Sequence, residues 1–306
     1  MVGSLYLAAA LSLSCAPPLA RFKPAGSPGD TIDPVAVYQT VDAVKLGEPL
    51  GVSVDLQGNI FIADGLPGQL IRIEAGRDAA REFQPPPRQP GFRPSDIKLQ
   101  GFFIYTIDQV GRALLRYDKD GAYRDILLNF NETDAVRRVS PCGLGVDSSG
   151  RIAITDVENH QILMFDVYLN LEKAFGNYGS YPGQLDSPEG VSFTPAGDLL
   201  VADTGNKRIQ WFGSQGEFIQ TVPAPGSPNP LVQPRRVVMA EDGRIYIADP
   251  GAGRLFVFDD TGLRQSLRPR GAGEFRPTDV EVTGSGRLYV TDAAGRALYV
   301  FKVVSD

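Results

Sequence analysis

The chain has very little histidine, cysteine or tryptophan. Its 306 residues include one histidine (His160), two cysteines (Cys15 and Cys142) and one tryptophan. A histidine-based metal site needs two or three imidazoles, and a disulfide framework needs more cysteines, so both are excluded. The Cys-x-x-Cys spacing of zinc and redox sites is also missing.

Long apolar runs and an excess of positive charge are missing as well. No stretch of 18 apolar residues follows the N-terminus, which excludes a multi-span membrane protein. The net charge of −6 is a poor match for nucleic acid, which requires a basic face. Because no nucleophile elbow, phosphate-binding loop or dinucleotide fingerprint occurs, no cofactor and no catalytic residue is predicted.

The N-terminus has the features of an export signal. Residues 5–14 form an apolar run that is too short to span a bilayer and that ends at Ser14-Cys15. The run resembles a bacterial lipoprotein signal, which implies a signal peptide over 1–15 and a lipid on Cys15. Residues 16–34, with five prolines, then read as an extended tether. A secreted protein cut near Ala20, or a buried N-terminal segment, remains an alternative.

The strongest signal in the chain is a sixfold internal repeat. Prolines 43 to 47 residues apart open the units, and aspartates 43 to 48 residues apart lie in their middle. The prolines are Pro49, Pro94, Pro141, Pro188, Pro234 and Pro277, and the aspartates are Asp64, Asp108, Asp156, Asp203, Asp249 and Asp292. Since one residue type recurs in every unit, we expect these aspartates to bind backbone N–H groups of their own loops.

Each unit has the pattern of an antiparallel sheet. The third and fifth positions after the proline are apolar in every copy, which is the period of a strand. A turn, a second strand that ends at the aspartate and a third strand follow, for example LLVAD and IQWF in unit four. Units of this length and pattern predict an all-β fold, a six-bladed β-propeller.

The last unit ends too early to supply its own fourth strand. The segment 35–46, which precedes the first unit, has strand composition. We therefore expect it to occupy the outer position of the sixth blade and to close the ring, so that the propeller extends over 35–306. Closure removes the exposed ends that an open stack of sheets would have.

Two stretches resemble the NHL repeat. They are Asp203-Thr-Gly-Asn-Lys-Arg-Ile-Gln-Trp-Phe212 and Asp156-Val-Glu-Asn-His-Gln-Ile-Leu-Met-Phe165. The connector 175–190 looks like the linker between blades of that family. The resemblance implies a six-bladed propeller, but propellers host many unrelated activities.

Polar residues just after the repeat prolines are expected to approach the central channel. Asp96, Glu189 and Asp279 are candidate calcium ligands there, because calcium prefers oxygen ligands in loose geometry. Lys98, Arg235 and Arg236 come from the same layer and would neutralise them. The sequence thus favours a network of ion pairs, with a small polar ligand or a metal as alternatives.

These observations favour a non-enzymatic module that binds or scaffolds proteins in the bacterial cell envelope. The partner-binding candidates are Tyr178, Tyr181, Arg235 and Arg236, since aromatic residues and arginine dominate protein interfaces. His160 and Cys142 are expected to be a loop residue and a packing residue, and Trp211 a core residue. A monomeric propeller within a larger assembly, periplasmic or in the outer membrane, is predicted. The alternative is a lactonase-like or hydrolase-like enzyme at the channel mouth.

Overall fold

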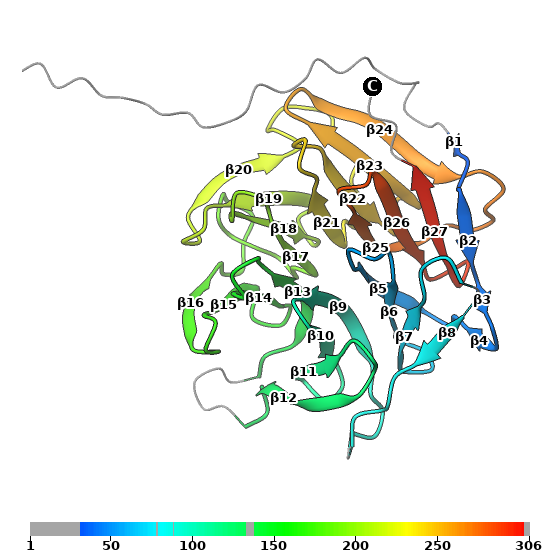
Figure 1. Ribbon diagram of the computed structural model, residues 1–306. Helices are drawn as coiled ribbons and strands as arrows, with labels where there is room; N and C mark the ends of the chain where they lie inside the picture. The colour runs from blue at the N-terminus through cyan, green and yellow to red at the C-terminus, as the bar shows by residue number, and fades with distance from the viewer. Residues whose placement is uncertain (1–30, 78, 88, 133–137, 303–306) are drawn as a thin grey trace, which may run out of the picture.

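The computed structural model describes residues 31–302 apart from 78, 88 and 133–137. In Figure 1 the strands of this part stand in separate sheets around a common centre. Six main sheets, here called blades 1 to 6, follow one another along the chain, and a two-stranded hairpin lies beside them. Within the described part, no helix is both long and apolar enough to cross a membrane.

Blades 1 to 3 each contain four antiparallel strands in chain order. Blade 1 consists of β5 (Pro49–Val54), β6 (Ile60–Asp64), β7 (Gln69–Ile73) and β8 (Ala80–Glu82). Blade 2 consists of β9 (Pro94–Gln100), β10 (Phe103–Asp108), β11 (Ala113–Asp118) and β12 (Tyr123–Asn129). Blade 3 consists of β13 (Pro141–Val146), β14 (Ile152–Asp156), β15 (Gln161–Phe165) and β16 (Leu171–Phe175).

Blades 4 to 6 repeat this order. Blade 4 consists of β17 (Gly190–Phe193), β18 (Leu199–Asp203), β19 (Arg208–Phe212) and β20 (Phe218–Val222). Blade 5 consists of β21 (Arg236–Met239), β22 (Ile245–Asp249), β23 (Arg254–Asp259) and β24 (Gly262–Pro269). Blade 6 contributes β25 (Pro277–Val282), β26 (Arg287–Asp292) and β27 (Ala297–Lys302). The predicted all-β six-bladed propeller is thus confirmed.

The hydrophobic core is divided among the contacts between neighbouring blades. In β6, Ile60 and Ile62 pack toward blade 6, whereas Phe61 and Ala63 pack toward blade 2, so both faces of the strand are buried. Each of the six pairs of adjacent blades has such a cluster, including the pair of blades 6 and 1. The alternating side chains of a strand therefore explain both the near-continuous apolar sequence and the closed ring.

The N-terminal strand closes the ring as predicted, but with fewer residues than expected. β2 (Ala36–Tyr38) pairs antiparallel with β27 as the outer strand of blade 6. The rest of the predicted strand forms the small hairpin of β3 (Thr40–Val41) and β4 (Val44–Lys45). The left-handed φ of 55° at Asp42 turns the chain there.

The segment just before this strand differs from its predicted role. β1 (Thr31–Ile32) lies parallel to the end of β24 as a fifth strand of blade 5, although 16–34 reads as a tether from its prolines. A strand of two residues is too short to show the alternating pattern by which a strand is predicted from sequence. The predicted signal peptide over 1–15, including Cys15, lies outside the described residues.

The six recurring aspartates, here called the latch aspartates or latches, hold the chain in place by accepting backbone hydrogen bonds. All are buried, at no more than 1% exposure, and each stands where the second strand of its blade ends. Each accepts backbone N–H groups 15 to 17 residues earlier, in the segment that enters its own blade. The donors are Gly47 and Glu48, Arg93, Ser140, Asp186, Val232 and Gln233, and Arg276.

Four of the latches also accept backbone N–H groups from their own loop, as the sequence predicts. The loop donors are Val110, Asn159, Ala252 and Ala294. A carboxylate that accepts several N–H groups holds the entering segment and the loop in one arrangement. This requirement is the same in every blade, which explains why the aspartate recurs.

Candidate functional site: the central channel and the connector face

The central channel is lined by the innermost strands of the six blades. The strands β5, β9, β13, β17, β21 and β25 contact one another in a ring and lie at the centre of Figure 1. Two positions of each strand, the second and fourth after the repeat proline, supply the residues that meet there. At the second position they are Gly51, Asp96, Gly143, Gly190, Arg236 and Asp279; at the fourth, Ser53, Lys98, Gly145, Ser192, Val238 and Glu281.

Arg236 fills the middle of this channel. Its side chain extends from blade 5 and donates a hydrogen bond to the backbone carbonyl of Glu189, the residue just before the first strand of blade 4. The other amino group donates to Ser95 O in blade 2, at 3.1 Å, and to Cys142 O in blade 3, at 3.3 Å. These hydrogen bonds let one side chain bridge four blades. Arg236 is only 2% exposed, so it lies buried inside the ring.

Glycines occupy the same level of the strands in blades 3 and 4. A Cβ atom at Gly190 would lie 2.3 Å from Arg235 O, and one at Gly143 would lie 2.6 Å from Glu189 O. Both distances are shorter than real Cβ contacts, so these strands approach as closely as backbone allows. Glycine at these positions of blades 3 and 4 thus lets the innermost strands of blades 3, 4 and 5 pack closely side by side.

Arg236 is paired with a buried carboxylate. Its Nε lies 3.3 Å from Asp96 Oδ2, and Asp96 is fully buried. Asp96 also accepts the backbone N–H groups of Ile97 and, from the next blade, Leu144, both at 2.8 Å. A buried charge is tolerated when it is paired and hydrogen-bonded, and Asp96 meets both conditions.

Lys98 forms the second half of the network. Its Nζ lies 3.9 Å from both Asp96 and Asp279 and 3.8 Å from Glu281. Burial lowers the pKa of Lys98, but the three carboxylates outweigh it and raise that pKa above its ordinary value. The ammonium therefore stays charged and links blade 2 to blade 6.

The network contains one carboxylate more than it has cations to neutralise. Asp96, Asp279 and Glu281 face two cations, Lys98 and Arg236. Asp279 is fixed by hydrogen bonds from the N–H groups of Val52 and Val280. Glu281, at the open side of the channel, is therefore the acid of the three that can take up a proton to remove the excess negative charge. Burial raises the pKa of Glu281 to about 7, even though Lys98 acts to lower it.

The predicted calcium ligands are paired with cations. Asp96 and Asp279 each have a carboxylate oxygen 3.9 Å from the Lys98 ammonium. Glu189 is paired with Arg235, at 3.5 Å. In the part of the chain that the structure describes, no group of three or more His, Cys, Asp or Glu side chains is arranged to hold a metal ion.

The partner-binding candidates fall into two classes. Tyr178 and Tyr181 are 68% and 75% exposed, on the connector that leads from blade 3 to blade 4. Arg236 was predicted with them as an interface residue, and this prediction is wrong because its side chain is buried in the channel. Arg235 is half-buried at the rim, paired with Glu189.

The connector that carries the two tyrosines is rigidly held. Leu185 exchanges backbone hydrogen bonds with Asn177 and Gly179, at 2.9 and 3.1 Å. Arg208 of blade 4 donates to Ser180 O and Tyr181 O and is itself paired with Asp203 at 2.7 Å. The tyrosines are therefore presented from a fixed backbone rather than from a loose loop.

The single histidine is part of the same connector contact. His160 Nδ1 accepts the backbone N–H of Ser187 at 2.9 Å, and its ring packs on Tyr178 with 4.8 Å between centroids. Cys142 is free and buried, and Trp211 packs partly buried against the core between blades 4 and 5. These placements match a loop, a packing and a core residue.

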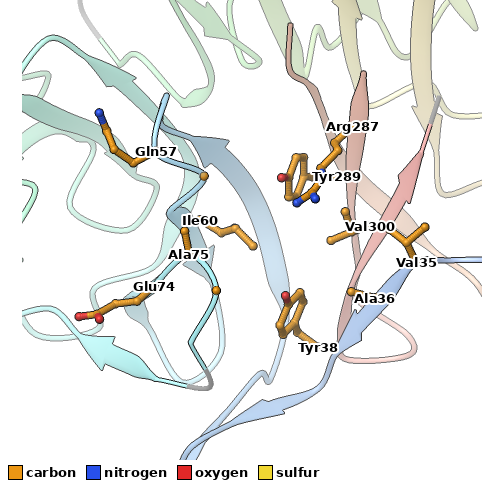
Figure 2. A pocket seen from close by; sticks show the side chains of 12 residues that line it. Val35, Ala36, Tyr38, Gln57, Ile60, Glu74, Ala75, Arg287, Tyr289 and Val300 are labelled. Atoms are coloured by element: carbon orange, nitrogen blue, oxygen red, sulfur yellow. The ribbon is translucent and has the colours of Figure 1, made fainter. Parts of the chain in front are cut away.

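A separate pocket of about 300 Å³ lies at the seam where the ring closes. Figure 2 shows Ile60 of blade 1 facing Tyr289 and Val300 of blade 6, with Tyr38 of β2 below them. Sequence reasoning missed this pocket because its walls come from both ends of the chain. Its lining is mixed and brings together no nucleophile and base, so we assign it no chemistry.

Comparison with known protein families places an NHL repeat in blade 4. The model of the NHL repeat matches residues 185–212, which run from the end of the connector through β19. The protein is thus a six-bladed β-propeller that carries an NHL repeat.

The curated relatives that the chain matches are longer proteins. Over 124 residues the chain is 29% identical to "Protein brain tumor" of Drosophila melanogaster, covering 40% of this chain and 12% of that protein. Over 142 residues it is 30% identical to human "E3 ubiquitin-protein ligase TRIM32", covering 43% and 21%. It is also 31% identical over 166 residues to "Peptidyl-alpha-hydroxyglycine alpha-amidating lyase 2" of Drosophila melanogaster, covering 52% and 39%. The chain spans less than half the length of these relatives.

A solved structure shows the same fold at low identity. A catalytically inactive histidine-to-alanine variant of virginiamycin B lyase from Staphylococcus aureus, solved with quinupristin, superposes with a TM-score of 0.62. The match is 13% identical and covers 84% of this chain and 82% of the lyase. At this identity the likeness describes the propeller fold alone.

Proposed function

We propose that this propeller is a non-enzymatic module that binds a protein partner through its connector face, in the envelope of a bacterial cell. The observation that carries the proposal is the closed channel. Arg236 crosses the central channel from blade 5 to blade 2, and the acids around it are paired with Arg236 and Lys98. The connector face presents two exposed aromatic residues, Tyr178 and Tyr181, and we take it as the recognition surface.

The two tyrosines are the best recognition residues on that face. Their backbone is already fixed by Arg208 and by the Leu185 contacts, so binding costs little conformational entropy. Exposed aromatic side chains on a rigid support are typical of residues that dominate protein interfaces. Tyr178 and Tyr181 therefore form the centre of the proposed contact.

The lyase relatives support the alternative of an enzyme at the channel mouth. One solved lyase is inactive when a histidine is replaced by alanine. Here the only histidine, His160, lies under Tyr178 on the connector face and uses its Nδ1 for the Ser187 N–H. This chain lacks a free imidazole at the channel, so the binding function is favoured over a lyase of that kind.

Photo-crosslinking distinguishes the two faces of the propeller. A photoreactive phenylalanine at position 178 or 181 should form a covalent adduct with one defined protein in cells. Tyr168 provides a matched control, because it is a tyrosine of blade 3 that is 82% exposed and lies in the β15–β16 turn at the opposite end of the strands. The same adducts at all three positions, or none at 178 and 181, would contradict the proposal.

The tether is a separate part of the proposal. Its support is the sequence around Cys15, and a mature bacterial lipoprotein with two or three acyl chains stays bound to its membrane. Cys15→Ala should move the protein from the membrane to the soluble fraction, whereas Cys142→Ala, at the other cysteine, should not. Wild-type protein in the soluble fraction would refute the tether and leave the crosslinking result unaffected.

A further inference from the structure

A second hollow, on the connector side between blades 5 and 6, is lined by arginine. It measures about 420 Å³ and is formed by the β22–β23 loop with Arg254, by Arg268 at the end of β24, and by the segment 273–276. Three arginines (Arg254, Arg268 and Arg276) face one acid, Glu274, in a chain whose net charge is −6. The charge of this pocket is therefore opposite to that of the whole protein.

The hollow exists because the connector here is short. Seven residues, 270–276, join β24 to β25, whereas 14 residues join β16 to β17 and 13 join β20 to β21. At the blade 3 loop the longer connector fills the corresponding space with Tyr178 and Ser187 against His160. Between blades 5 and 6 this space stays open.

Arg254 differs from the arginine at the same position of the preceding repeat. Both stand five residues after the latch aspartate, and Arg208 pairs with its own Asp203 at 2.7 Å. In blade 5 the latch Asp249 is occupied by the N–H groups of Val232, Gln233 and Ala252. The one hydrogen bond that the Arg254 guanidinium makes within the described residues is long, 3.4 Å to Ser266 O.

The other two arginines have complementary roles in the pocket. Arg268 donates to Ala272 O and Gly273 O, at 3.1 and 2.6 Å, and so holds the short connector in place. Arg276 is exposed and, among the described residues, forms no ion pair, and the same is true of Arg254 and Arg268. Guanidinium groups without a carboxylate partner are the residues that recognise oxyanions in two-pronged geometry.

We propose that this pocket binds an oxyanion, either a carboxylate or a phosphate group of a ligand, with Arg254 and Arg276 as its contacts and Arg268 as a positioning residue. Glu274 at the edge opposes the anion and sets its affinity. This site is independent of the proposed contact at Tyr178 and Tyr181.

Calorimetric titration of the full-length protein with inorganic phosphate, and separately with the dicarboxylate glutarate, tests the proposal. We expect saturable binding of at least one probe, weakened at least tenfold by Arg254→Gln and by Arg276→Gln. Glu274→Gln should tighten binding severalfold, because it removes the opposing charge. The probe that saturates at the lower concentration identifies the class of oxyanion.

A charge-matched control separates a site from general attraction. Arg287→Gln changes the net charge equally but lies at the seam pocket of Figure 2. It should leave the affinity unchanged. Equal weakening by all three arginine variants, no effect of Glu274→Gln, or no saturation by either probe would overturn the proposal. Unchanged melting temperatures verify that each variant is folded.

Discussion

Removing the channel plug should destabilise the whole propeller. Arg236→Ala deletes the nearer of the two cations paired with Asp96, at 3.3 Å, and the donors to the carbonyl groups of Glu189, Ser95 and Cys142. Removal of one member of a buried ion pair costs about 3–5 kcal/mol, because the remaining charge stays buried. For a domain of this size that cost lowers the melting temperature by about 10 °C.

Denaturant titration and thermal melting measure this cost against a control. Arg287→Ala removes an exposed arginine and should stay within about 0.5 kcal/mol of wild type. In a double-mutant cycle, Arg236→Met and Asp96→Asn together should cost less than the two single changes added, by about 1–3 kcal/mol. A loss below about 1 kcal/mol for Arg236→Ala, or strict additivity in the cycle, would refute the reasoning.

Four further predictions concern other parts of the fold. The pKa of Glu281 in the folded protein, about 7, is above its ordinary value of 4.5, so the stability that this carboxyl contributes is present below pH 4.5 and is lost as the pH rises through 7. Glu281→Gln should abolish this loss, which is on the order of 3 kcal/mol. Equal pH dependence of stability in the wild-type and variant proteins would contradict this. Asp249→Ala leaves three backbone N–H groups without an acceptor and should cost about 3 kcal/mol in denaturant titration, whereas a cost near zero would refute the latch. Arg296 is exposed at a φ of 49°, so Arg296→Gly should raise stability by up to about 1 kcal/mol, and a lower melting temperature would be contrary to this. Deletion of 35–46 should expose the edge of β27 and lower the melting temperature, and an unchanged value would exclude closure by β2.

The sequence was sufficient for the architecture because the same physical demand recurs in each unit. Alternating apolar residues predict strands in every unit, and the latch aspartate has the same hydrogen-bonding task in all six blades. The truncated last unit and the strand-like 35–46 together predict ring closure. That inference needed only the number of strands, not their contacts.

The channel and the pockets depend on distances that no repeat pattern contains. The sequence places Arg236 in the layer that approaches the channel, but only the closed ring shows that its side chain bridges four blades. The signal that was available is the choice of residue at this position of the repeat, where three units have glycine and three have a charged residue. The arginine pocket depends on the short connector 270–276 next to Arg254, which becomes visible only when blades 5 and 6 are placed side by side.

The closed, charge-paired channel is the central claim, and a calcium measurement tests it most directly. Elemental analysis and calorimetry on wild-type protein, Asp96→Ala and Asp279→Ala report whether these carboxylates hold a metal or only Lys98 and Arg236. We expect no stoichiometric calcium in wild-type protein and no calcium-dependent change in melting temperature. Stoichiometric calcium that disappears in either variant, together with a hydrolase activity, would contradict the account and establish an enzyme at the channel mouth.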